Sequence, residues 1–124
     1  ARGDERALVA GVYRRRLAIG MALQSDPTVI YGLARLGRYW GNLTRANMAI
    51  DTPYNTYRRP GLPPGPIAAP GRAALEAAVR PVETDYLYFV SRNDGSHAFA
   101  RTLAEHSRNV RRFQVEPSRA SRPR

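Results

Sequence analysis

Two short segments concentrate polar and aromatic side chains between rigid turns. Residues 24–33 read QSDPTVIYGL, and residues 54–67 read YNTYRRPGLPPGPI. A packed amphipathic element repeats its apolar residues every two or every three to four positions, and neither segment does so. Amides, carboxylates, hydroxyls and aromatic rings supply hydrogen bonds and ring-stacking contacts, so the two segments predict a shaped polar surface.

Both segments resemble the endolytic murein transglycosylase family. The combination of DPTVIYG, YNTY and GLPPGPI in this order is specific, and the similarity runs from about Asp4 to Phe113. One departure is Arg15, because relatives usually have Asn before Arg-Leu at this position. Three flanking segments carry the same resemblance: VAGVYRRRL at 9–17, LYFVSRNDGSHAF at 87–99 and LAEHSRNV at 103–110.

The resemblance implies a lytic transglycosylase, a lyase that cleaves glycan strands between MurNAc and GlcNAc without water. One carboxylic acid protonates the glycosidic oxygen and then acts as base on the sugar's own primary hydroxyl, which closes a 1,6-anhydro ring. Burial of that acid against apolar neighbours raises its pKa to suit this role. The family's catalytic Glu precedes the helix that corresponds to residues 4–18, so we expect it upstream of Ala1. The chain would then be the C-terminal part of the catalytic domain and inactive alone.

No carboxylate within the chain is convincing as this acid. Glu5 is nearest to the expected position, yet the first turn of a helix favours its ionised form. Asp26 lies in the polar motif, and its position before Pro27 favours a role as helix N-cap. The remaining glutamates fall on a helix surface, in a turn, in a capping box and in the tail: Glu76, Glu83, Glu105 and Glu116.

Sugars are bound by amide and carboxyl hydrogen bonds and by aromatic faces, which the two segments provide. Alternatives remain open: Tyr31 and Tyr57 as core residues, Asn55 as a turn former, and His97 as a structural histidine. His97 lies in a Gly-x-His pattern of the family and is expected to line the cleft. The expected substrate contacts are Gln24, Asp26, Thr28, Tyr31, Tyr54, Asn55, Thr56, Tyr57 and His97.

Neither a metal nor another cofactor is expected. The two histidines, nine residues apart, lack a recognised ligand spacing. Prolines between the glycines of residues 61–71 remove the backbone N–H donors that a phosphate-binding loop needs.

Several short helices are predicted to position these side chains. Residues 4–18 collect Leu8, Val9, Val12, Tyr13 and Leu17 on one face. A short helix should start at Asp26 and run through Tyr31, and another should follow the Thr44 cap. Residues 72–79 form an Ala-rich helix with Leu75, Ala78 and Val79 inward, and a final helix after Thr102 places Leu103, Val110 and Phe113 inward.

One β-hairpin and one long loop complete the predicted elements. Residues 86–90 and 97–100 have strand composition, and the Asn93–Gly95 cluster between them indicates the turn. Residues 52–70 contain six prolines and therefore predict a long ordered loop. The fold class is thus α+β, a single small domain of residues 1–115, with a disordered basic tail at 116–124.

The chain is strongly basic, with a formal net charge of +10, and every cation is an arginine. Such a surface attracts polyanions, including an anionic cell-wall polymer. A nucleic-acid-binding domain is the weaker alternative, because the aromatic residues do not interleave with Arg in a recognised RNA-binding motif. A non-catalytic peptidoglycan-binding module is the other alternative.

The resemblance also implies a cellular setting. The partners would be peptidoglycan glycan strands and cell-wall synthases, and the site of action would be the periplasmic face of the bacterial inner membrane. No run of apolar residues in this chain is long enough to span a bilayer, so a membrane anchor is expected in a segment that is not present here.

Overall fold

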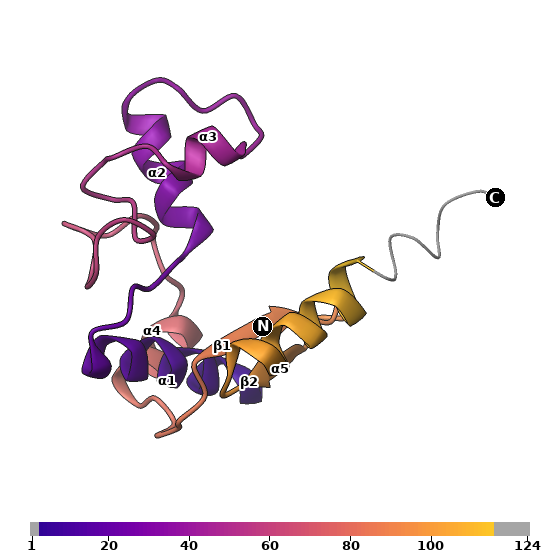
Figure 1. Ribbon diagram of the computed structural model, residues 1–124. Helices are drawn as coiled ribbons and strands as arrows, with labels where there is room; N and C mark the ends of the chain where they lie inside the picture. Colours follow the sequence, from indigo (N-terminus) through magenta and orange to yellow (C-terminus); the bar gives the residue numbers. More distant parts are fainter. Residues whose placement is uncertain (1–2, 116–124) are drawn as a thin grey trace. The chain divides into compact units, whose positions relative to one another are not determined.

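The computed structural model describes residues 3–115 and confirms the α+β class (Figure 1). The predicted tail at 116–124 lies outside the described residues. A π-helical turn at Arg111–Val115 follows the last helix. The elements in chain order are α1 at Gly3–Ile19, α2 at Asp26–Arg35, α3 at Arg45–Met48, α4 at Arg72–Val79, β1 at Tyr88–Ser91, β2 at His97–Ala100 and α5 at Leu103–Val110.

The described residues form two compact units. Unit 1 comprises the chain up to Arg15 and from Gly71 onward. Unit 2 is the continuous stretch Arg16–Pro70, which includes both polar segments and the Pro-rich loop. His97 is the one expected contact residue that belongs to unit 1.

The hairpin of unit 1 is antiparallel and pairs Tyr88 with Ala100 and Ser91 with His97. Asn93 and Gly95 have φ of +66° and +89° in the connecting turn, a conformation that these residue types accept readily. Helix α5 contacts both strands. The predicted hairpin is therefore present, with β1 displaced slightly toward the turn.

Helix α1 approaches the segment after α4 very closely. The amide of Val82 donates to the Ala7 carbonyl oxygen over 2.9 Å. A Cβ built on Gly11 would lie 2.1 Å from the Val82 carbonyl oxygen, so only glycine fits here. Val12 is fully buried, and the Tyr13 ring meets Phe89 edge to face at 5.7 Å.

Several predicted core positions of unit 1 are exposed. Leu75, Ala78 and Val79 of α4 are all exposed, as is Leu103 of α5, so the predicted inner faces are wrong at these positions. Short helices at the surface of a small unit have few neighbours against which to pack. Val110 and Phe113 are half-buried, in the predicted direction.

Unit 2 is organised around α2, whose buried residues are Thr28, Val29, Gly32 and Leu33. The N-cap is Ser25, and Asp26 is the first helical residue, so the prediction of Asp26 as N-cap is wrong by one position. The helix also continues four residues beyond Tyr31. Thr44 caps α3 as predicted, in a reciprocal capping box with Asn47.

Leu17 was predicted to face the interior, but the residue that lies in the interior of unit 2 is Arg16. Leu17 is exposed, whereas Arg16 is buried and its guanidinium donates to the carbonyl oxygens of Ala22 and Leu23. The hydrogen bond to Leu23 is 2.7 Å long. A buried guanidinium is tolerated because its donors are satisfied by backbone oxygens.

Candidate functional site

A closed set of hydrogen bonds joins the two polar segments within unit 2. The Ser25 amide donates to Thr56 Oγ1 over 2.9 Å, and Thr28 Oγ1 donates to the Ser25 carbonyl oxygen over 2.6 Å. The two hydroxyl oxygens lie 2.8 Å apart. Because the Thr28 hydrogen is already used, Thr56 must donate to Thr28. The ring therefore starts and ends on the backbone of Ser25.

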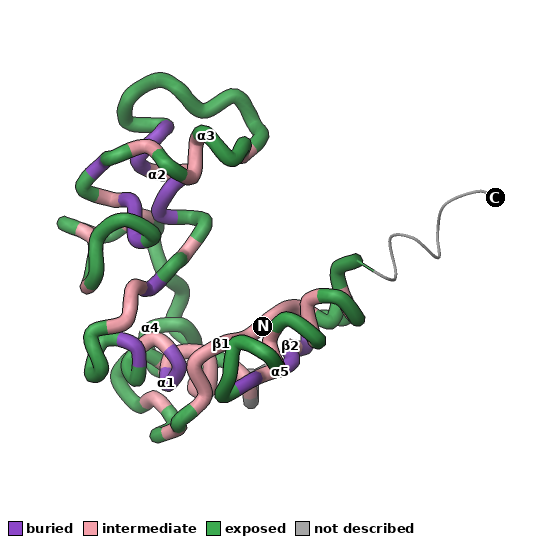
Figure 2. Tube along the Cα trace, in the orientation of Figure 1, coloured by how far each residue is buried: buried purple, intermediate pink, exposed green. Residues whose placement is uncertain are grey.

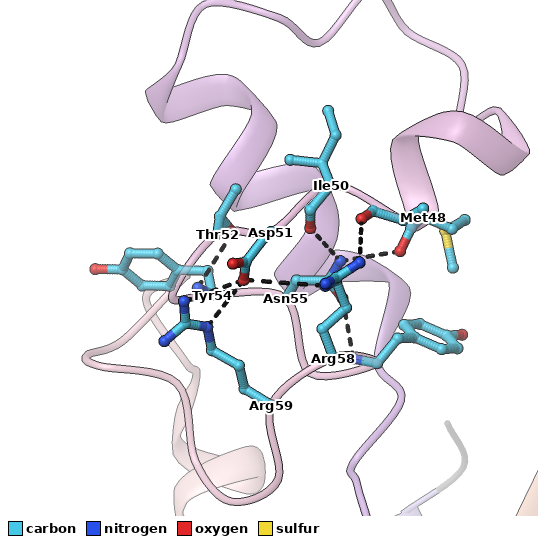
Figure 3. A network of polar contacts seen from close by, with 10 residues as sticks. Met48, Ile50, Asp51, Thr52, Tyr54, Asn55, Arg58 and Arg59 are labelled. Carbon is cyan, nitrogen blue, oxygen red and sulfur yellow. Dashed lines mark hydrogen bonds and ion pairs between the residues drawn. The ribbon is translucent and has the colours of Figure 1, made fainter.

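Asn55 holds the second segment in place (Figure 3). Its side-chain nitrogen donates to the carbonyl oxygens of Met48 and Ile50 over 2.9 and 2.7 Å. Its side-chain oxygen accepts from the Tyr57 amide over 3.0 Å. Asn55 is 1% exposed, so its amide group is occupied by the fold and positions the chain around it.

Of the expected contact residues in unit 2, Gln24, Asp26 and Tyr57 are exposed. Exposed and buried stretches alternate along this unit (Figure 2). The Tyr57 hydroxyl donates to Asp26 Oδ1 over 2.5 Å, which links the segments at the surface. Gln24 has φ of +51°, a left-handed conformation that is unusual for this residue type. Its backbone amide donates to the Thr56 carbonyl oxygen over 3.3 Å. The hydrogen bonds between the two segments therefore also hold the left-handed backbone at Gln24.

Tyr31 and Tyr54 form an aromatic pair in the same unit. Their ring centroids are 4.8 Å apart, and both side chains belong to half-buried residues. The Arg35 guanidinium lies 5.9 Å from the Tyr31 ring and 5.5 Å from the Tyr54 ring. Arg35 was not among the predicted contacts, although its position four residues after Tyr31 places both on one helix face.

His97 lies in unit 1, at the start of β2, and its partner is Glu5 on α1. The His97 amide donates to both Glu5 carboxylate oxygens over 2.9 and 3.2 Å, and Nδ1 lies 3.3 Å from Glu5 Oε1. Sequence analysis gave Glu5 a role at the helix start and did not connect it to His97. A separation of 92 residues carries no local pattern that could reveal this contact.

Most of the described carboxylates accept a hydrogen bond or lie beside an arginine. Glu5 and Asp26 accept the hydrogen bonds given above, and Glu83 is exposed. Asp85 accepts from Arg101 and thereby raises the pKa of that guanidinium. Four more have a nearby partner: Asp51 has Arg58 and Arg59, Glu76 has Arg72, Asp94 has Ser96, and Glu105 has Thr102.

Within residues 3–115, no helix combines the length and apolar character needed to cross a membrane. Among the side chains that the structure describes, no three His, Cys, Asp or Glu residues converge in a way that could hold a metal ion.

Comparisons with known proteins agree with the motifs. The endolytic murein transglycosylase of Bacillus subtilis (strain 168) is 41% identical over 109 residues, which are 88% of this chain and 29% of that protein. The endolytic murein transglycosylase of Streptococcus pneumoniae serotype 2 (strain D39) is 38% identical over 116 residues, covering 89% and 20%. The chain thus spans less than a third of the length of these relatives.

A solved structure has the same fold. The crystal structure of a yceG-like protein from Listeria monocytogenes matches with a TM-score of 0.73 and 43% sequence identity, covering 84% of this chain and 32% of that one. The model of the YceG-like family matches residues 1–112. The resemblance predicted from DPTVIYG, YNTY and GLPPGPI is therefore confirmed: this chain belongs to the YceG-like family.

Proposed function

We propose that this chain is part of an endolytic peptidoglycan lytic transglycosylase, which cleaves MurNAc–GlcNAc linkages and leaves 1,6-anhydro-MurNAc ends. Residues 1–115 would be the C-terminal portion of its YceG-like domain. The observation that carries the proposal is the family match over residues 1–112, together with relatives that are endolytic murein transglycosylases. A surface of amide, carboxylate, hydroxyl and aromatic groups in unit 2 is chemically suited to a glycan.

The expected contact residues divide into two roles in this proposal. Gln24, Asp26 and Tyr57 are exposed and bind sugar hydroxyl and N-acetyl groups, beside the aromatic faces of Tyr31 and Tyr54. The buried members act from within: Thr28, Asn55 and Thr56 hold the surface in shape through their internal hydrogen bonds. A strained backbone at Gln24 supports a functional role, because such strain persists mainly where a site requires it.

The general acid in this proposal is a Glu upstream of Ala1. Glu5, Asp26 and Asp51 accept hydrogen bonds from an amide, a hydroxyl and a guanidinium group, whereas the reaction needs a carboxylic acid that holds a proton and donates it. The site of action would be the periplasmic face of the inner membrane, with glycan strands as substrate and cell-wall synthases as partners.

The test compares purified full-length protein with residues 1–124 on isolated peptidoglycan. We expect 1,6-anhydro muropeptides, detected by mass spectrometry, from the full-length protein alone. Release by residues 1–124 would place the acid within this chain and refute the upstream Glu. Glycan binding by the full-length protein without any cleavage would instead support a non-catalytic binding module.

A matched pair of full-length variants tests the glycan surface. Asp26→Asn should lower kcat/KM about tenfold, because a charged hydrogen-bond acceptor for the sugar is lost. Asp85→Asn, which changes an exposed carboxylate paired with Arg101 in unit 1, is the control and should retain full activity. Equal activity of the two variants would remove Asp26 from the proposed surface.

A further inference from the structure

The Glu5–His97 pair is more elaborate than a surface ion pair. The carboxylate accepts the His97 backbone amide as well as facing the ring, so it joins α1 to the first residue of β2. Both side chains are only 17% exposed. The His97 ring also meets Phe89 edge to face at 5.6 Å and Phe99 at 6.4 Å. Backbone, carboxylate and two aromatic rings thus fix the orientation of the imidazole.

This geometry selects one form of the neutral ring. An ionised carboxylate can only accept hydrogen bonds, so the Nδ1 atom that faces Glu5 must carry the hydrogen. In a neutral imidazole the other nitrogen, Nε2, is then an acceptor. Within the described residues Nε2 forms no hydrogen bond, and the side chain keeps some solvent exposure. The ring therefore presents one oriented acceptor that has no partner among the described residues of unit 1.

We propose that Glu5 is a positioning residue that holds His97 as the Nδ1–H tautomer, so that Nε2 accepts a hydrogen bond from a hydroxyl group of the glycan. This inference rests on the proposed function for its ligand. The chemistry fits a sugar, since a neutral acceptor beside aromatic rings suits a hydroxyl group next to the C–H face of a pyranose. The carboxylate plays the part that second-shell carboxylates play toward metal-bound histidines, which is to set the tautomer and the ring direction.

The tautomer can be measured without any activity assay. In histidine-labelled protein of the full chain, long-range ¹H–¹⁵N NMR spectra of the neutral ring should show His97 protonated at Nδ1. Glu5→Gln should increase the share of the Nε2–H tautomer, because a carboxamide can donate to Nδ1 as well as accept from the His97 backbone. His97 found protonated at Nε2 in the unchanged protein would overturn the inference.

Kinetics of full-length variants test the contact with substrate. His97→Asn retains a donor near the position of Nδ1 and loses Nε2, so kcat/KM should fall about tenfold or more while the protein stays folded. His97→Gln reaches the position of Nε2 and should recover part of the loss. The kcat/KM of Glu5→Gln should lie between those of His97→Asn and His97→Gln. Glu76 is an exposed α4 carboxylate paired with Arg72, and Glu76→Gln should have the kcat/KM of the unchanged protein.

The outcomes separate this inference from the proposed function. If the unchanged full-length protein releases no anhydro muropeptides, the proposed function fails, and the NMR result still reports on the pair. If that protein is active and His97→Asn matches it, the inference fails and the function stands. If His97→Asn loses its fold, as seen in its circular dichroism, Glu5→Gln decides: an unchanged kcat/KM in folded Glu5→Gln protein would refute the positioning role of Glu5.

Discussion

The two units differ in the kinds of residue that fill their interiors. In unit 2 five polar residues, Arg16, Thr28, Thr52, Asn55 and Thr56, are buried together with the apolar Leu23, Val29 and Leu33. In unit 1 the buried side chains are small or apolar apart from Ser96, and the packing of the hairpin relies on rings such as Tyr13, Phe89 and Phe99. Polar interiors are specified by hydrogen-bond direction, whereas aromatic interiors are specified by shape.

Among the described residues, each unit has one non-glycine residue in the left-handed region, and the two differ in the hydrogen bonds that their side chains make. Asn93, in the hairpin turn of unit 1, tolerates this conformation and its side chain donates to the Phe113 carbonyl oxygen over 2.6 Å. Gln24, in unit 2, is a less suitable residue type and its side chain is exposed. In unit 1 the left-handed residue, Asn93, shapes the hairpin turn. In unit 2 the left-handed residue, Gln24, lies on the proposed binding surface.

The largest expected effect tests the polar interior of unit 2. Asn55→Ala should lower the free energy of unfolding by about 3 kcal/mol, because two carbonyl oxygens and one amide lose their partner in a buried place. Urea unfolding followed by circular dichroism measures this change. A loss below about 1 kcal/mol would show that water replaces the amide and that this interior is not specified by hydrogen bonds.

A pair of glycine substitutions compares shape constraints in the two units. Gly11→Ala in unit 1 should cost about 2 kcal/mol, because the new Cβ would meet a backbone oxygen at 2.1 Å. Gly32→Ala in unit 2 should cost less, since its nearest contact is the Thr52 side-chain oxygen at 2.5 Å. Gly65→Ala, with open space around it, is the control. Equal losses at Gly11 and Gly32 would contradict a tighter backbone approach in unit 1.

Substitution of a left-handed residue should change the free energy of unfolding by a smaller amount and in the opposite direction. Gln24→Gly should raise the free energy of unfolding by about 1 kcal/mol, because glycine relieves the backbone strain. The same change should reduce peptidoglycan cleavage by the full-length protein. Asn93→Gly should show no such gain, since it removes the hydrogen bond to Phe113. Thermal unfolding of the two variants side by side decides whether strain is confined to the proposed surface.

The smallest expected effect on stability lies at the exposed edge of unit 2. Tyr57→Phe removes the hydrogen bond to Asp26 and should change the free energy of unfolding by no more than about 0.5 kcal/mol. Turnover by the full-length protein should nevertheless fall, because Asp26 loses the contact that orients it. A stability loss comparable with that of Asn55→Ala would place Tyr57 with the interior.

The sequence predicted the elements better than it predicted their inner faces. Turn and cap residues determine the hairpin, α3 and α4 locally, and their bounds agree closely with expectation. The exposure of Leu75 and Val79, and the burial of Arg16, depend on which distant segments are available as neighbours. Apolar periodicity describes a single helix and has no information about those segments.

For the candidate site too, the sequence predicted which residues belong together better than it predicted which of them are buried. Family motifs brought Gln24, Asp26 and Tyr57 into one group, and unit 2 does place the two polar segments in contact. Which members are buried scaffolding could not be read from the sequence, since Thr28 and Thr56 carry the same hydroxyl whether they face solvent or each other. The Glu5–His97 contact was also missed, because it joins two stretches of unit 1 that are far apart in the sequence.

The hydrogen-bond ring through Ser25, Thr56 and Thr28 fixes the direction of its hydroxyl groups as well as the distances between them. Because one end is an amide donor and the other a carbonyl acceptor of the same residue, both hydroxyl rotors can point in only one sense around the ring. Their rotational entropy is therefore already lost in the free protein. If a glycan binds at Gln24 and Asp26 as proposed, the two neighbouring hydroxyl groups are already ordered, and the glycan does not have to order them itself.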